Sequence, residues 1–250
     1  MSEDAGTPVQ ETGSELRVQD VRLFMLPFAG ANVNSYKAIQ AALEKEDIRT
    51  TALELPGHGA RGPEPLLSDI EAMETDLYNR IEPHTGEPFA LFGHSMGSLL
   101  AYRLAHRLIG EKKSPVCMIV SGRAAPSVPL RRKRLHALPQ QDFFQEVRKL
   151  GGMPEAILQS TELMEYFAPI LRSDFQAVET YQHRTEPGLP IPVSVILGED
   201  DTVTREDAER WDELVLGNIQ LTMVAGAHFY LLEQPEKTAH IIRDSIRTSL

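Results

Sequence analysis

Residues 88–102 read PFALFGHSMGSLLAY: a short apolar run, the pentapeptide Gly-His-Ser-Met-Gly at 93–97, then leucines and alanines at helical spacing. The run predicts a buried strand, and the spacing predicts a helix directly after it. The chain must turn sharply between them, and Gly93 and Gly97 let the two elements pass close together. Ser95 therefore stands at a tight turn, in the Gly-x-Ser-x-Gly pattern that is typical of a strained, exposed nucleophile.

The rest of the chain alternates between strand and helix patterns. Short apolar or β-branched runs predict six strands, at about 21–26, 48–54, 88–93, 116–121, 192–198 and 219–224. Helical patterns lie between them, near 35–45, 68–82, 96–109, 204–215 and 236–249. Strands that are apolar along their whole length and alternate with helices predict an α/β fold around a mostly parallel, doubly wound sheet.

One connection is much longer than the others. Residues 122–191 separate the fourth predicted strand from the fifth, far more than a crossover needs. Within this connection, 139–151 and 161–182 have the patterns of amphipathic helices. We therefore expect a single domain over residues 21–250, with a helical lid inserted at about 124–187.

The composition limits the partners and the compartment. A formal charge of −11 argues against general nucleic-acid binding, because phosphates need a basic face. Residues 1–20 are polar, have neither the basic nor the apolar region of a signal peptide, and are expected to form a disordered leader. No window approaches the ~18 apolar residues of a membrane span. Cys117, the single cysteine, lies in an apolar run, so we expect an inert buried thiol and a cytoplasmic protein.

Catalysis by Ser95 would need two further side chains. A serine hydroxyl is a weak nucleophile, so a histidine must accept its proton and an acid must orient that histidine. In this architecture the chain order is serine, acid, histidine. His228 follows the last predicted strand and is the expected base. Asp200 and Asp201 compete for the acid, and a Gly-x-x-Asp turn from Gly198 favours Asp201.

Chemistry at an acyl carbon also needs hydrogen-bond donors for an oxyanion. The N–H of Met96, directly after the nucleophile, is the first expected donor. The second should come from the loop after the first strand, from Ala29 or Phe28. His94, just before the nucleophile, is expected to shape the turn and not to transfer protons.

A second glycine motif has the spacing of a nucleotide-binding site. Residues 57–62 read GHGARG, the Gly-x-Gly-x-x-Gly spacing of dinucleotide sites. Such a site needs a helix to begin there, whereas Pro63 and Pro65 follow, so we interpret the motif as a loop. No group of Cys, His and Asp has zinc spacing, and neither a metal nor another cofactor is expected.

Five segments carry a resemblance to a known family over about residues 20–245. They are LPFAGAN, LPGHGAR, FGHSMGSLLAYRLA, GAHFYLL and, most specifically, the lid segment GGMPEAILQSTELMEYFAPILRSDFQAVETY. The chain resembles the stand-alone type II thioesterases that serve polyketide synthases and non-ribosomal peptide synthetases, relatives of the medium-chain thioesterase of fatty-acid synthase. The resemblance implies an α/β-hydrolase fold with a lid. It assigns the triad to Ser95, Asp201 and His228 and the oxyanion hole to Ala29 and Met96.

The resemblance also implies a reaction and a partner. Such enzymes hydrolyse acyl groups from the phosphopantetheine arm of carrier proteins and so restore stalled assembly lines. Neither nucleic acid nor membrane is an expected partner, and a monomer is expected. The residues alone leave open a small-molecule carboxylesterase, an acyltransferase, or a non-catalytic protein that uses the fold to bind a partner.

Two local features refine these expectations. The first loop has Gly30-Ala31 where the family usually has Gly-Gly, and a methyl at Ala31 is expected to narrow the entrance. Between 122 and 150 the chain is locally basic, against its overall charge. Because carrier proteins are typically acidic, a cluster in this stretch is predicted to steer them to the lid: Arg131, Arg132, Lys133 and Arg134.

Overall fold

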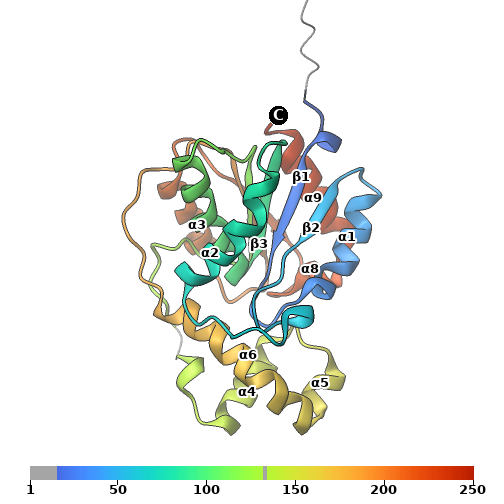
Figure 1. Ribbon diagram of the computed structural model, residues 1–250, viewed down its shortest axis with the longest axis vertical. Helices are drawn as coiled ribbons and strands as arrows, with labels where there is room; N and C mark the ends of the chain where they lie inside the picture. Colours follow the sequence, from blue (N-terminus) through green and yellow to red (C-terminus); the bar gives the residue numbers. More distant parts are fainter. Residues whose placement is uncertain (1–15, 132–133) are drawn as a thin grey trace, which may run out of the picture.

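The computed structural model describes residues 16–131 and 134–250, and these residues contain one parallel sheet (Figure 1). Its strand order is β2-β1-β3-β4-β5-β6, and every neighbouring pair is parallel. The strands are β1 (Arg22–Leu26), β2 (Arg49–Ala52), β3 (Phe89–His94), β4 (Met118–Ser121), β5 (Val193–Gly198) and β6 (Gln220–Val224). The predicted α/β fold and all six predicted strands are confirmed, with ends that shift by one or two residues.

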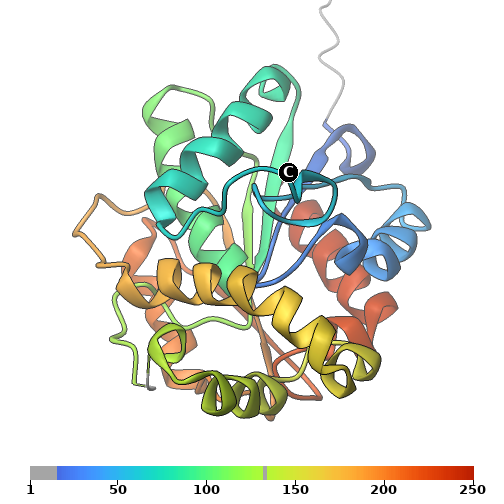
Figure 2. The same cartoon turned by 60° about the horizontal axis from the view of Figure 1, so that its bottom comes forward.

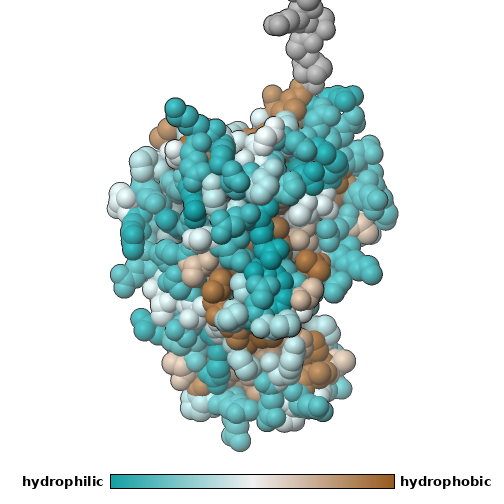
Figure 3. Space-filling model, viewed as in Figure 1, coloured by the Kyte–Doolittle hydropathy of each residue, from teal (hydrophilic) through white to brown (hydrophobic). Residues whose placement is uncertain are grey.

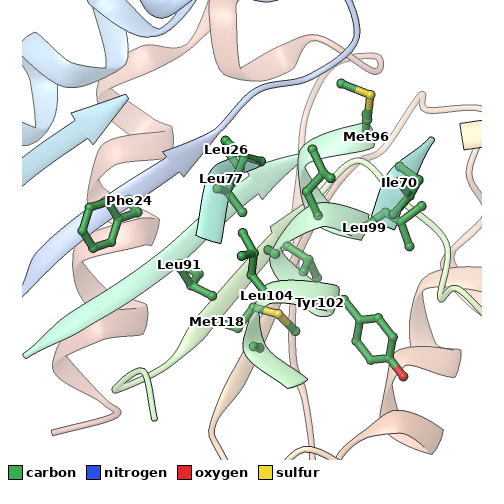
Figure 4. Packing of buried hydrophobic residues seen from close by; sticks show 14 of the residues in the cluster. Phe24, Leu26, Ile70, Leu77, Leu91, Met96, Leu99, Tyr102, Leu104 and Met118 are labelled. Carbon is green, nitrogen blue, oxygen red and sulfur yellow. The ribbon is translucent and has the colours of Figure 1, made fainter. Parts of the chain in front are cut away.

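Helices cover both faces of the sheet. The longer ones outside the lid are α1 (Lys37–Glu44), α2 (Ile70–Ile81), α3 (Met96–Gly110) and α9 (Pro235–Arg247), with α7 (Arg205–Glu209) and α8 (Tyr230–Glu233) as short additions. Alternate strand residues face opposite sides: Phe24 and Leu26 pack with α2 and α3, whereas Leu23 and Met25 pack with α1 and α9. Figure 4 shows the first of these cores, where side chains of α2 and α3 lie against β1 and β3.

The lid is formed by the predicted insertion between β4 and β5. It contains α4 (Gln140–Leu150), α5 (Glu155–Gln159) and α6 (Thr161–Thr180), which lie beyond one end of the sheet (Figures 1 and 2). The lid has its own apolar cluster: Leu135, Phe143, Phe144, Val147, Met164, Ala168, Leu171 and Phe175. At the other end of α6, Ala177 and Val178 join the core of the sheet, so the lid is anchored to the main body by packing. On the face drawn in Figure 3, apolar side chains gather toward and on the lid.

The structure differs from the predicted elements in a few places. The helix predicted at 204–215 is interrupted, because α7 gives way to a tighter 3₁₀ helix (Arg210–Leu214). Trp211 of this segment is fully buried, and its indole N–H donates to the Arg123 carbonyl, 3.0 Å away in the connection after β4. Residues 1–15 of the predicted leader lie outside the described residues. The remaining 3₁₀ helices are Val18–Asp20, Val33–Tyr36, Gly59–Arg61, Glu82–His84 and Leu135–Ala137.

No helix within 16–131 and 134–250 has both the length and the apolar character that a membrane crossing requires.

Candidate active site

The turn at Ser95 is as sharp as the sequence predicts. Ser95 joins β3 to α3 with φ +53° and ψ −112°, a combination that L residues rarely adopt. The flanking glycines are required by close packing. A Cβ on Gly93 would lie 2.0 Å from the Gly97 carbonyl oxygen, and one on Gly97 would lie 2.5 Å from the Leu26 carbonyl oxygen. The hydroxyl is therefore held at the start of a helix, where unpaired N–H groups favour negative charge.

The structure brings His228 and Asp201 together from the loops after β6 and β5. Asp201 Oδ2 lies 2.8 Å from His228 Nδ1, while Oδ1 accepts the Val203 N–H at 3.0 Å. Burial alone would raise the pKa of Asp201, but the hydrogen bond and charge of His228 and the Val203 N–H outweigh it, and the pKa lies below its usual value. The carboxylate is thus ionised at neutral pH. Asp200 is exposed, and its N–H bonds to the Gly226 carbonyl.

Ser95 and His228 line the same cavity. No hydrogen bond joins their side chains in the described part of the chain, which is common in free hydrolases, where this bond tightens only with substrate bound. Ala29 and Phe28 line the cavity as well. The Ala29 N–H has no hydrogen-bond acceptor among residues 16–131 and 134–250. The N–H of Met96, the first residue of α3, has no acceptor within the helix.

His94 lies behind the site, fully buried. Its Nδ1 is 2.8 Å from Ser121 Oγ, which in turn is 2.5 Å from the hydroxyl of Tyr230. Burial and the neighbouring His228 ring, whose centroid is 4.8 Å away, hold the pKa of His94 well below its usual value. His94 is therefore neutral and packs beneath the turn, as expected. The sequence does not indicate that Ser121 and Tyr230 belong to this site, because 109 positions separate them.

The cavity beside Ser95 has a volume of about 290 Å³. Its walls are mostly apolar and come mainly from the lid, with polar residues from the first loop. The lining residues are Phe28, Ala29, Gly30, Asn32, Asn34, Ser35, Ser95, Val147, Leu150, Gly151, Gly152, Met153, Pro154, Ile157, Phe167, Leu171, Phe175, His228 and Phe229. Ala31 is not among them. It is 1% exposed and packs in the core beside α1, so the expectation that its methyl narrows the entrance is wrong.

The loop at 57–62 contains a 3₁₀ turn, and no α-helix begins there. A carboxylate already binds its backbone: Glu54 accepts the Ala60 N–H of the loop at 2.9 Å, and also the Val33 N–H of the loop after β1 at 3.2 Å. This negative charge would repel a phosphate. His58 of the loop is buried and lies 2.9 Å from Asp174 of the lid helix α6, a contact that the sequence analysis did not anticipate.

The structure describes only part of the predicted basic cluster. Arg131 forms two hydrogen bonds with the carboxylate of Asp207, each 3.0 Å long, although its side chain is 69% exposed. Arg134 is exposed. Arg132 and Lys133 lie outside the described residues. No group of three or more His, Cys, Asp and Glu side chains able to hold a metal ion occurs in the described residues.

Comparison with known proteins identifies the family. Residues 21–246 match the model of the thioesterase domain. The chain belongs to the thioesterase family. It is 34% identical to the gramicidin S biosynthesis protein GrsT of Aneurinibacillus migulanus, over 92% of this chain and 90% of GrsT. It is 33% identical to thioesterase PikA5 of Streptomyces venezuelae, over 90% of this chain and 81% of PikA5.

Solved structures agree with this assignment. BorB, the type II thioesterase from the borrelidin biosynthetic cluster, superimposes with a TM-score of 0.83 at 35% identity, over 90% of this chain and 92% of BorB. The predicted family and the α/β-hydrolase fold are confirmed. The protein is thus a hydrolase that acts on thioesters.

Proposed function

We propose that the protein is a type II editing thioesterase that hydrolyses acyl groups from the phosphopantetheine arm of carrier proteins in polyketide or non-ribosomal peptide assembly lines. The relatives named in gramicidin S and borrelidin biosynthesis support this setting. One observation carries the proposal: a strained Ser95 and a His228 bonded to Asp201 share the wall of an apolar cavity.

The first half-reaction transfers the acyl group to the enzyme. Ser95 Oγ attacks the thioester carbonyl carbon while His228 Nε2 accepts the hydroxyl proton. Asp201 holds the proton on Nδ1, so that Nε2 is free to act as the base. The N–H groups of Ala29 and Met96 stabilise the oxyanion of the tetrahedral intermediate. When the C–S bond breaks, His228 protonates the departing phosphopantetheine thiolate.

The second half-reaction releases the acid. His228 takes a proton from a water molecule, whose oxygen attacks the ester carbonyl of acyl-Ser95. The second tetrahedral intermediate uses the same two N–H donors, and its collapse returns the proton to Ser95 Oγ. The products are a free carboxylic acid and a carrier with its thiol restored.

The cavity supports an acyl substrate. Its lid-derived walls bury apolar surface, which favours binding by about 25 cal/mol per Å² of apolar area removed from water. The polar side, at Asn32, Asn34 and Ser35, suits the amide groups of a phosphopantetheine arm. The proposal includes action in the cytoplasm, as a monomer and without a cofactor of its own, and these three points stay predictions.

Replacing the nucleophile tests the mechanism. Ser95→Ala deletes one hydroxyl and should lower hydrolysis of an acyl-loaded carrier by about 10³-fold or more, with the melting temperature nearly unchanged. Release of the carrier thiol is measured for both proteins, beside hydrolysis of a free ester. A folded variant that stays active would refute the serine mechanism. Preference for the free ester would indicate a carboxylesterase. Transfer of the acyl group to an acceptor other than water would indicate an acyltransferase. Carrier binding without turnover would indicate a non-catalytic protein.

The carrier partner can be tested through charge. Lys133→Glu together with Arg134→Glu should raise KM for an acyl-carrier substrate and weaken its salt dependence, because the acidic carrier loses attraction. The kcat/KM for a small acyl thioester should stay near that of the wild type. Arg131 is left intact because it pairs with Asp207. Equal effects on both substrates would indicate structural support of the lid, and no effect would place the docking surface elsewhere.

A further inference from the structure

A buried carboxylate links the lid helix to the loop that carries Ala29. Asp174 of α6 is fully buried, and its Oδ2 accepts the Gly30 N–H at 2.7 Å. The same oxygen lies 2.9 Å from Nε2 of His58, in the loop after β2. Three segments that are far apart in the sequence therefore meet at one oxygen atom, immediately beside the proposed oxyanion hole.

The geometry assigns a positive charge to His58. His58 Nδ1 lies 3.0 Å from the Pro56 carbonyl, which can only accept, so Nδ1 carries a proton. Nε2 faces the Asp174 oxygen that already accepts from Gly30, so it is a donor too. Both ring nitrogens therefore donate, and His58 is an imidazolium. Burial lowers the pKa of His58, but Asp174, the Pro56 carbonyl and the charge of Glu54 outweigh it, and the pKa is raised.

The loop that Asp174 holds is a tight turn. The Ala31 N–H bonds to the Phe28 carbonyl at 2.9 Å, which makes Ala29 and Gly30 the central residues of a β-turn. Gly30 has φ +75°, the pattern of a type II turn. The lid helix packs directly on this turn, since a Cβ on Gly30 would lie 2.6 Å from Leu171 Cδ2. The Gly30 N–H belongs to the central peptide, whose orientation distinguishes turn types I and II.

We propose that Asp174 is a positioning residue of the lid, which anchors the Phe28–Ala31 turn through the Gly30 N–H and thereby holds the Ala29 N–H, at the first central position of that turn, toward the oxyanion. His58 donates to the same Asp174 oxygen and places its positive charge beside it. The lid helix thus contributes to transition-state stabilisation as well as to the acyl cavity. This inference rests on the proposed serine mechanism, in which Ala29 is a donor.

Two substitutions of Asp174 weaken its hydrogen bond to the Gly30 N–H to different extents. Asp174→Asn keeps the volume and an acceptor for the Gly30 N–H but loses the charge, and charged acceptors bind roughly twice as strongly as neutral ones. Asp174→Ala removes the acceptor. We expect kcat for an acyl-carrier thioester to fall by about 10-fold for Asn and about 100-fold for Ala, within the ~10²–10³-fold that loss of a whole oxyanion donor costs. KM should change by less than about 3-fold, because the interaction forms in the transition state.

A matched control lies on the same helix. Glu179 is also a buried carboxylate that accepts backbone N–H groups, from Leu135 at 2.9 Å and His136 at 3.1 Å, and these partners lie in the lid and not in the Phe28–Ala31 turn. Glu179→Gln should lower the melting temperature as Asp174→Asn does and leave kcat within about 3-fold of the wild type. If both variants lose kcat equally, the effect is general loosening of the lid, and the proposal fails.

A pair of inhibitors separates positioning from structural support without a turnover measurement. Octylthio trifluoropropanone forms a tetrahedral adduct with an active serine, whereas octylthio propanone fills the same cavity mainly as a ketone. For the Asp174 variants, affinity for the fluorinated compound should fall by the same factor as kcat, with affinity for the plain ketone unchanged. Equal losses for both compounds, or no loss for either, would overturn the proposal.

The serine mechanism is checked in the same series. If Ser95→Ala still binds the fluorinated ketone tightly, the proposed function itself fails. If that variant loses binding while the Asp174 variants keep wild-type affinity, only the positioning role fails.

Discussion

Asp201→Asn should trap His228 in the wrong tautomer. In the wild type, Asp201 Oδ1 accepts the Val203 N–H at 3.0 Å and the Thr202 hydroxyl at 3.4 Å, and Oδ2 faces His228 Nδ1. In the variant, the amide oxygen must take the Oδ1 position, because that position faces donors. The NH₂ group then faces His228 and donates to Nδ1, which leaves the proton on Nε2. An Nε2 that already carries a proton cannot accept one from Ser95.

These contacts set the size of the expected loss in kcat/KM. Turning the amide over would leave the half-buried Val203 N–H without its acceptor, at a cost of about 1–3 kcal/mol. Only about one molecule in 5 to one in 150 then has the productive tautomer. The variant also lacks the negative charge that stabilises the imidazolium during reaction. Together these effects should lower kcat/KM by about 10³- to 10⁴-fold, as for other triads.

The assay compares two neighbouring substitutions. Asp200→Asn is the control, since Asp200 is exposed, and it should keep kcat/KM within about 2-fold, as surface substitutions usually do. Rates are measured on an acyl-carrier substrate, and the ¹⁵N shifts of His228 report its tautomer. A loss below 10-fold for Asp201→Asn, or equal losses for the two variants, would refute the reasoning. So would a large loss in a variant whose His228 keeps the proton on Nδ1.

Two further predictions concern the lid and its buried pair. Gly152→Ala should lower the free energy of unfolding by about 1–3 kcal/mol and raise KM, because the φ of Gly152 is +80° and a Cβ there would lie 2.4 Å from the Phe229 ring, which lines the cavity. The control is Gly86→Ala, where a Cβ meets nothing within 4 Å. Melting temperature and kinetics are compared for the two variants. The raised pKa of His58 adds stability that is complete below the ordinary value of 6.5 and is lost as pH rises through the higher folded value. The difference in unfolding free energy between the wild type and the double variant His58→Gln with Asp174→Asn should therefore shrink above pH 6.5. A difference that is flat or grows with pH would contradict the raised pKa of His58.

The parts of the site that the sequence predicted depend on local geometry. Ser95 lies between a strand and a helix that both have clear periodic patterns, so the turn between them follows directly. The choice of Asp201 over Asp200 rested on spacing from Gly198. In the structure, the Asp201 N–H bonds to the Gly198 carbonyl at 3.2 Å, which closes the turn and directs the Asp201 side chain toward His228.

The parts that the sequence did not predict depend on distant contacts. His58 and Asp174 are 116 positions apart, and neither stands in a motif that names the other. The predicted helix at 204–215 was wrong in its second half, a 3₁₀ helix whose Trp211 likewise bonds to a carbonyl 88 positions away. Periodicity reports which face of an element is apolar, but it does not report which polar group on another element will meet a buried side chain.

The lid helix shows why its sequence carries the most specific resemblance. Leu171, Asp174 and Phe175 have i, i+3, i+4 spacing and so share one face of α6. Leu171 and Phe175 line the acyl cavity, and Asp174 between them holds the Gly30 N–H. A shift of one residue along the helix would turn this face by about 100°, because a helix has 3.6 residues per turn. The cavity wall and the hydrogen bond to Gly30 would be lost together. Under the proposed mechanism, catalysis as well as packing therefore constrains the order of apolar and acidic residues in this segment.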